Sequence, residues 1–131
     1  MTEPQQLIAE AREAAEQSYS PYSHFRVGAV VIAADGSKHS GCNVENAAYN
    51  HTICAEANAI TTAAANGVRE IDTVAVACLD SDGCTPCGNC RQMMREFNVR
   101  RVIVTDEAGA PVEYELADLL PHSFGPEDLQ K

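Results

Sequence analysis

Basic residues are scarce in this 131-residue chain: nine Lys and Arg stand against nineteen Asp and Glu, giving a formal net charge of −10. No stretch of the sequence gathers basic residues into a cluster. Proteins that bind the phosphate backbone of DNA or RNA need clustered Lys and Arg. The charge balance therefore argues against a nucleic-acid partner and favours a small-molecule substrate.

The chain also lacks long apolar runs, repeats, linkers and low-complexity segments. A membrane-spanning helix needs about 18 or more apolar residues in a row, and none is present. The acidic, polar start over residues 1–6 does not resemble a secretory signal. We therefore expect a single catalytic domain over residues 1–131, without membrane association. Cysteines with the spacing of metal ligands, in a chain without a signal, indicate a reducing cytoplasm.

The most informative motif present is Cys54-Ala55-Glu56, followed later by a second cysteine pair, Cys87 and Cys90. Thiolates select zinc or iron–sulfur clusters, and zinc prefers tetrahedral geometry. Three protein ligands leave a fourth position open, where bound water becomes acidic, its pKa falling from about 15.7 to roughly 7. We expect one Zn²⁺ per chain on the three cysteines, with Glu56 as the catalytic proton carrier.

Hydrophobic periodicity and turn signals predict an α/β protein. The Asp35-Gly36 pair predicts an antiparallel hairpin at the start of the sheet. Helices that alternate with buried strands imply a sheet covered by helices on both faces. The expected helices cover 4–18, 54–65, 87–97 and 116–120, and the expected strands cover 26–33, 38–43, 71–78, 101–105 and 112–114. The three candidate ligands then lie at two helix N-termini, whose partial positive charge stabilises thiolates.

A purely structural zinc site is the alternative. His51 or Cys84, each three residues from a candidate ligand, could supply a fourth ligand and close the coordination sphere. That interpretation leaves Glu56 without a role. Cys42 and Cys78 fall in expected strands and are interpreted as ordinary buried thiols.

Five segments, in order and over nearly the whole chain, resemble the cytidine deaminase family in its three-cysteine form. They read SPYSHFRVGA (20–29), GCNVENAAY (41–49), CAE (54–56), PCGNCRQ (86–92) and LLPHSFGPEDL (119–129). The resemblance implies a three-layer α/β/α fold with a mixed sheet of about five strands. It also implies zinc-dependent deamination of cytidine and 2′-deoxycytidine to uridine and 2′-deoxyuridine, in pyrimidine salvage.

The resemblance assigns roles to residues of the substrate site. Taken alone, Phe25 is an ordinary core aromatic, but its place in the first motif implies packing against the pyrimidine. Asn43 and Glu45 alternate along an extended segment, so both can face one way and suit a diol. By resemblance they bind the sugar hydroxyls, chiefly the 3′-OH. The Ala55 amide is then expected near the base O2, and the Thr85 carbonyl is expected to receive the leaving amine.

Further implied contacts cross between subunits. Ala47 and Tyr49 are expected to reach the sugar in a neighbouring subunit, and Phe124 to close a neighbouring pocket. The expected active unit is therefore a homotetramer with shared active sites.

Position 57 departs from the family, which commonly has an arginine there that bonds the ligand sulfurs, whereas this chain has Ala57. We expect Arg91 to bond a ligand thiolate and take over this role. Deaminases that act on blasticidin S also lack that arginine, so a blasticidin-type aminonucleoside substrate is the alternative enzyme function. A small zinc-stabilised interaction module is the alternative without catalysis.

Overall fold

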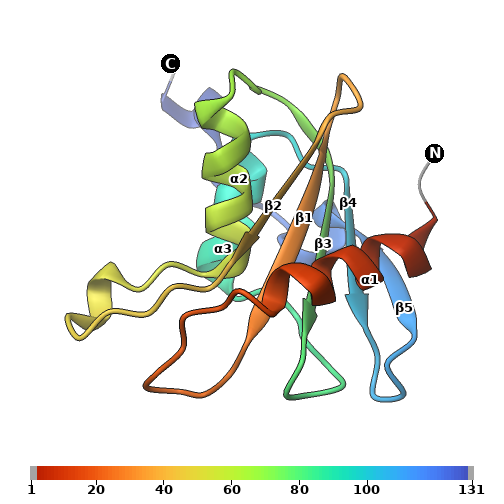
Figure 1. Ribbon diagram of the computed structural model, residues 1–131. Coiled ribbons are helices and arrows are strands. Elements are labelled where there is room, and N and C mark those ends of the chain that lie inside the picture. The colour runs from red at the N-terminus through yellow and green to blue at the C-terminus, as the bar shows by residue number, and fades with distance from the viewer. Residues whose placement is uncertain (1–2, 130–131) are drawn as a thin grey trace.

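A computed structural model describes residues 3–129 as a five-stranded sheet in the order β2-β1-β3-β4-β5 (Figure 1). The expected domain also includes residues 1, 2, 130 and 131, which lie outside the described residues. The strands are β1 (Val27–Ala33), β2 (Lys38–Cys42), β3 (Ile71–Cys78), β4 (Arg101–Thr105) and β5 (Pro111–Glu115).

The sheet is mixed. β1 pairs antiparallel with both β2 and β3, β3 and β4 pair parallel, and β4 and β5 pair antiparallel. The expected hairpin joins β1 to β2, and Gly36 adopts the left-handed φ of +91° in its turn. A parallel pair needs a crossover connection, and α3 (Gly88–Glu96) supplies it between β3 and β4. This crossover brings the start of α3 to the carboxyl end of β3.

Helices cover both faces of the sheet, so the expected three-layer α/β/α architecture is confirmed (Figure 1). α1 (Pro4–Ala15) lies on one face, and its apolar stripe packs on alternate residues of the central strands. α2 (Ala55–Ala65) and α3 lie on the other face, over the larger core. No helix within residues 3–129 has the length and apolar character needed to cross a membrane.

The two helices on the second face both begin at a cysteine. Cys54 is the N-cap of α2 and Cys87 is the N-cap of α3. α2 is alanine-rich, which favours helix and allows close packing, and it ends where Gly67 takes a φ of +92°. α3 ends similarly, at Asn98 with a φ of 59°. Local sequence thus sets both ends of the helices that carry the candidate ligands.

The structure differs from expectation chiefly at α1, which ends at Ala15 and not at residue 18. Glu16 and Gln17 form a turn after the helix, and the Ser18 hydroxyl bonds the distant Asn43, a tertiary contact that the local sequence pattern does not contain. Three short elements complete the chain: η1 (Tyr49–His51), α4 (Leu116–Leu119) and η2 (Pro126–Leu129). Sequence patterns predicted α4 but neither 3₁₀ segment.

Helix α1 passes close to the backbone of β1 at Gly28. A Cβ on Gly28 would lie 1.9 Å from the Ala11 carbonyl oxygen and 2.5 Å from the Ala15 amide nitrogen. Gly28→Ala is therefore expected to push α1 off the sheet and to lower the free energy of unfolding by about 1–3 kcal/mol. Urea unfolding of both proteins measures this. Gly83→Ala is the matched control, because nothing lies within 4 Å of its Cβ position. Equal stability of the Gly28 and Gly83 variants would contradict this account of the packing.

Candidate metal centre and substrate site

Three cysteines come together where α2 and α3 begin. The Sγ atoms of Cys54, Cys87 and Cys90 all lie within 4.8 Å of one another. Cys54 and Cys87 are N-caps, and Cys90 lies in the first turn of α3. Within residues 3–129 this is the one group of three or more His, Cys, Asp or Glu side chains close enough to share an ion.

The chemistry and size of this cluster fit zinc. Sulfurs about 2.3 Å from a tetrahedral zinc lie roughly 3.8 Å apart, a spacing within that of the cluster. Neither N-cap side chain hydrogen-bonds its own helix, so the first amides of α2 and α3 remain free to stabilise negative charge. A hydrogen bond from Cys90 lowers the pKa of Cys54 to about 7, against the opposing effect of burial. The same bond, together with burial, raises the pKa of Cys90, so in the absence of a metal Cys54 is the thiol of this pair that ionises first.

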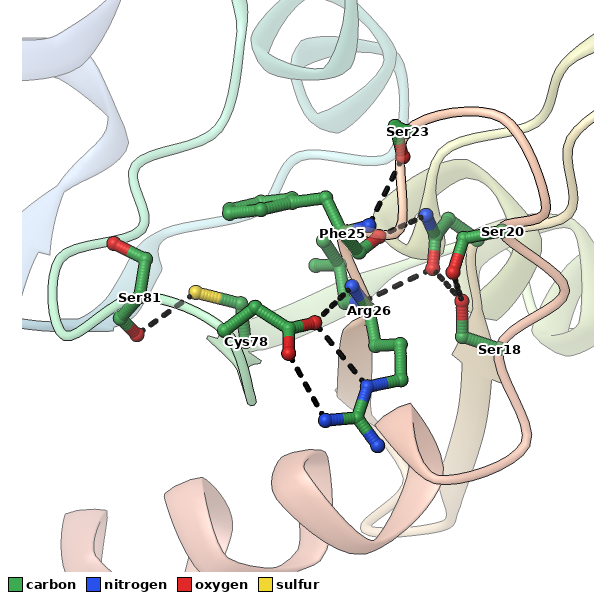
Figure 2. A network of polar contacts seen from close by, with 10 residues as sticks. Ser18, Ser20, Ser23, Phe25, Arg26, Cys78 and Ser81 are labelled. Carbon is green, nitrogen blue, oxygen red and sulfur yellow. Dashed lines mark hydrogen bonds and ion pairs between the residues drawn. The ribbon is translucent and has the colours of Figure 1, made fainter.

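No fourth ligand closes the cluster among the described residues. His51 lies exposed on η1, outside the group. Cys84 is also outside it, and its pKa is raised first by burial and then by the neighbouring Cys78. The Cys78 thiol in turn donates to the Ser81 carbonyl oxygen at 3.1 Å (Figure 2). The geometry thus favours an open, three-thiolate site over a closed structural one.

Glu56 lies against the cluster as a buried carboxyl group, only 5% exposed, in the first turn of α2. Burial raises the pKa of Glu56, because a charged carboxylate loses hydration there. Hydrogen bonds from its own backbone amide and from the Cys90 thiol act in the opposite direction. This carboxyl group can therefore hold a proton beside the expected metal position.

Asn43 follows β2 and is buried, and its polar atoms bond the segment before β1. Its Oδ1 accepts from the Ser18 hydroxyl and from the Val27 amide at 3.0 Å. Its Nδ2 donates to the Phe25 carbonyl at 2.8 Å. Since an amide oxygen has two lone pairs and an amide nitrogen two protons, one N–H of Asn43 is left for a further partner.

Glu45, two residues after Asn43, also bonds the segment before β1. Its Oε1 accepts from the amides of Tyr22 at 2.9 Å and Ser23 at 3.1 Å, and its Oε2 accepts from the Ser23 hydroxyl. The bond from the Ser23 hydroxyl is the main cause that lowers the pKa of Glu45, so the group is ionised at neutral pH. Asn43 and Glu45 thus face one segment of the chain, as their alternation predicted.

The remaining candidates for base contacts occupy different environments. The Phe25 ring is 39% exposed, so it does not belong to the buried core. Ala55 is fully buried as the first residue of α2, where its amide is one of the unpaired helix donors. Thr85 is exposed in the connection between β3 and α3, two residues before Cys87.

The candidates for contacts between subunits point outward. Ala47 and Tyr49 are exposed on the segment near η1, which extends away from the sheet (Figure 1). Tyr49 is 75% exposed and touches its own chain through the Tyr22 ring, edge-on at 6.2 Å between centroids. Phe124 is also exposed, and its carbonyl accepts from Gln92 Nε2 at 2.9 Å.

Comparison with known proteins decides the family. The model of the cytidine and deoxycytidylate deaminase zinc-binding region matches residues 1–106. The chain belongs to this deaminase family. The match includes all three clustered cysteines and Glu56, so the zinc expected from the sequence and the cluster seen in the structure agree.

Relatives of this deaminase cover nearly its whole length. The cytidine deaminase of Sporosarcina psychrophila is 44% identical over 127 residues, which are 95% of this chain and 93% of the relative. That of Mycobacterium tuberculosis is 39% identical over 127 residues, 95% of this chain and 92% of the relative. The crystal structure of cytidine deaminase from Burkholderia pseudomallei superposes with a TM-score of 0.86 at 40% identity, covering 95% of this chain and all of that one.

The expectation that Arg91 bonds a ligand thiolate in this deaminase is wrong. Its Nε donates to the Pro86 carbonyl and its Nη1 to the Leu119 carbonyl, both at 2.8 Å. The guanidinium thus ties the segment before Cys87 to the end of α4. These N–H groups donate to backbone carbonyls and not to the sulfurs. The negative charge of the cluster is therefore offset by the helix N-termini.

Ser18 and Ser23 are not among the residues predicted from the sequence, although their hydroxyls bond Asn43 and Glu45. Both serines lie in or beside the first family motif, which was a signal that this segment matters. Their partners, however, are more than twenty residues away along the chain, and only the fold brings them together.

Replacing a clustered cysteine should remove the metal. Cys90→Ser is expected to lose zinc and some stability, because a hydroxyl is a poor zinc ligand and metal binding is linked to folding. Metal analysis of the purified protein measures the zinc content per chain. Cys84→Ser and His51→Ala are the controls and should keep one zinc per chain. Loss of zinc from either control would mean that the site is closed after all.

Proposed function

We propose that this chain is a zinc-dependent deaminase that converts cytidine and 2′-deoxycytidine to uridine and 2′-deoxyuridine with release of ammonia. One observation carries the proposal: a buried carboxyl group lies in the first turn of α2, two residues after one of three cysteines that cluster at two helix N-termini. That arrangement joins a proton carrier to a metal site with an open position. The similarity to proteins named cytidine deaminase supports the choice of substrate.

Cys54, Cys87 and Cys90 are the proposed zinc ligands. When bound, zinc supplies a nucleophile from water near neutral pH, because it lowers the pKa of its water to roughly 7. Three thiolates on a divalent ion leave one net negative charge. The N-termini of α2 and α3 offset it, each being equivalent to about half a positive charge.

Glu56 is the proposed proton carrier. A proton given to N3 of the cytosine ring makes C4 electrophilic, and a second one delivered to the amino group at C4 lets it leave as ammonia. The first turn of α2 holds the buried carboxyl group two residues after Cys54, beside the ligands. In this scheme the Ala55 amide binds the base near O2 and the Thr85 carbonyl receives the amine.

The segment before β1 and the segment after β2 form the proposed nucleoside site. Phe25 packs on the pyrimidine with its partly exposed ring. Asn43 has one N–H left, and the ionised Glu45 accepts only, with one site left on Oε2. A sugar hydroxyl is both donor and acceptor, so one hydroxyl can satisfy both groups.

We propose further that the active unit is a cytoplasmic homotetramer of single 1–131 catalytic domains. Support comes from large apolar side chains that stay exposed on adjoining loops. β-bridges join Tyr19 to Val44 and Val44 to Ile53, and all three side chains are exposed, as are the paired rings of Tyr22 and Tyr49. Such a surface is typical of an interface.

Within that assembly, Ala47 and Tyr49 contact the sugar in a neighbouring site and Phe124 closes it. The cytoplasmic location rests on the six cysteines, all of which are free thiols, in keeping with a reducing compartment.

Glu56→Gln should abolish nearly all turnover. The amide keeps the shape but cannot carry the proton, so kcat for cytidine should fall by about 10² to 10⁴, with zinc content unchanged. Loss of ultraviolet absorbance during incubation with cytidine measures this. A wild type that leaves cytidine unchanged but deaminates blasticidin S would refute the proposed substrate. Near-normal turnover by Glu56→Gln would refute the proton-carrier role.

Glu45→Gln should raise KM for cytidine and leave zinc in place. The substitution removes the charge and mispairs a donor with the sugar hydroxyl, which polar sites penalise strongly. Free cytosine, which has no sugar, should be a poor substrate of the wild type. Steady-state kinetics on both substrates tests the assignment, and equal kcat/KM for cytosine and cytidine would rule it out.

A further inference from the structure

The groups proposed to hold the base and the sugar are connected through one hydroxyl group, that of Ser23. It bonds Oε2 of Glu45. It also bonds the amide nitrogen of Phe25 at 3.1 Å (Figure 2). A serine hydroxyl has a single proton and two lone pairs. Because an ionised carboxylate can only accept and a backbone N–H can only donate, the direction is fixed: Phe25 N–H to Ser23 Oγ, and Ser23 O–H to Glu45.

The backbone between them is shaped for this connection. His24 adopts a φ of 58°, in the left-handed region that few side chains other than Asn, Asp and His enter. Its amide bonds the Ser20 carbonyl at 3.0 Å, which closes the turn. The reversal at His24 brings the Phe25 amide back to the Ser23 hydroxyl. Such a conformation persists where surrounding bonds hold it.

The same connection continues to Asn43. The Phe25 carbonyl accepts from Asn43 Nδ2, so the two backbone polar groups of Phe25 are tied to the two proposed sugar ligands. The ring and the two polar side chains thereby form one hydrogen-bonded unit drawn from two separate segments. Chains of hydrogen bonds polarise and strengthen one another.

Ser23 also determines what Glu45 can offer a substrate. Two backbone amides occupy Oε1, and the Ser23 hydroxyl occupies one site on Oε2. The carboxylate cannot turn without losing all three donors. Without the hydroxyl, Oε2 would keep no fixed partner, and the acceptor site that remains for the substrate would no longer be defined.

We propose that Ser23 is a positioning residue for nucleoside recognition, which sets the Glu45 carboxylate to accept from a sugar hydroxyl. This inference rests on the proposed function. It predicts a loss confined to substrates that carry the hydroxyl, since Ser23 touches neither the metal cluster nor Glu56.

The test is the kinetics of Ser23→Ala on cytidine and on 2′,3′-dideoxycytidine, which lacks both ring hydroxyls. One lost hydrogen bond to a charged group corresponds to about a tenfold change in binding. We expect kcat/KM for cytidine to fall about tenfold, mostly through KM, and that for dideoxycytidine to change less than about twofold. Ser23→Thr, which restores the hydroxyl, should remain within about twofold of the wild type.

Two further comparisons separate positioning from general damage. Ser37 also bonds a carboxylate, Asp35 at 2.7 Å, but in the turn between β1 and β2, so Ser37→Ala should leave both substrates unaffected. In a Glu45→Ala background, Ser23→Ala should have an effect of less than about twofold, because the group that it positions is gone. Zinc content and thermal unfolding should match the wild type in every Ser23 variant, since Ser23 is exposed.

Equal losses on both nucleosides, or no loss on cytidine, would overturn the positioning role of Ser23 alone. Failure of Ser23→Thr to restore KM, or full additivity with Glu45→Ala, would do the same. A wild type that does not deaminate cytidine would refute the proposed function and this inference with it.

Discussion

The site depends on the convergence of two helix N-termini on one face of the sheet. Three thiols within 4.8 Å of one another, with the Glu56 carboxyl group nearby, would repel one another once ionised, and the chain as a whole is strongly acidic. The positive ends of α2 and α3 are the fixed opposing charge in the structure, since the guanidinium of Arg91 is bonded to carbonyl groups. Any change that separates these helix ends would remove both the ligand geometry and its electrostatic support.

Packing enforces this convergence. The parallel pairing of β3 and β4 requires a crossover, so α3 must start at the carboxyl end of β3 and run back along the sheet. α2 is seated on β2 at Gly41, where a Cβ would lie 2.5 Å from the Ala59 amide nitrogen. A missing side chain thus allows the closest approach, and the alanines of α2 keep the contact tight. The metal site is in this sense a consequence of how two helices fit one sheet.

The proposed nucleoside site is held together by hydrogen bonds and not by apolar packing. The segments around residues 18–27 and 43–53 have few buried apolar side chains, and side-chain to backbone hydrogen bonds hold them in place. In the proposed nucleoside site Asn43 and Glu45 therefore have two tasks, since each fixes the loop and keeps one hydrogen-bonding site for the sugar. The apolar surface that these loops leave exposed around Tyr19 and Tyr49 is the feature that most favours assembly with further copies of the chain.

Features that depend on local chemistry could be predicted from the amino-acid sequence. The spacing of Cys54, Glu56, Cys87 and Cys90 indicated the metal and the acid, and periodicity predicted every helix and strand of the sheet to within a few residues. These signals are reliable because ligand type and hydrophobic pattern act over short stretches of chain.

Contacts between residues far apart along the chain could not be predicted in this way, and the folded structure was needed to identify them. It left His51 and Cys84 outside the cluster, directed Arg91 to carbonyl groups, and paired Ser18 and Ser23 with Asn43 and Glu45. A long polar side chain can satisfy its hydrogen bonds with any suitable partner nearby. Which partner is nearby is set by how strands and helices pack, and no local pattern in the chain encodes it.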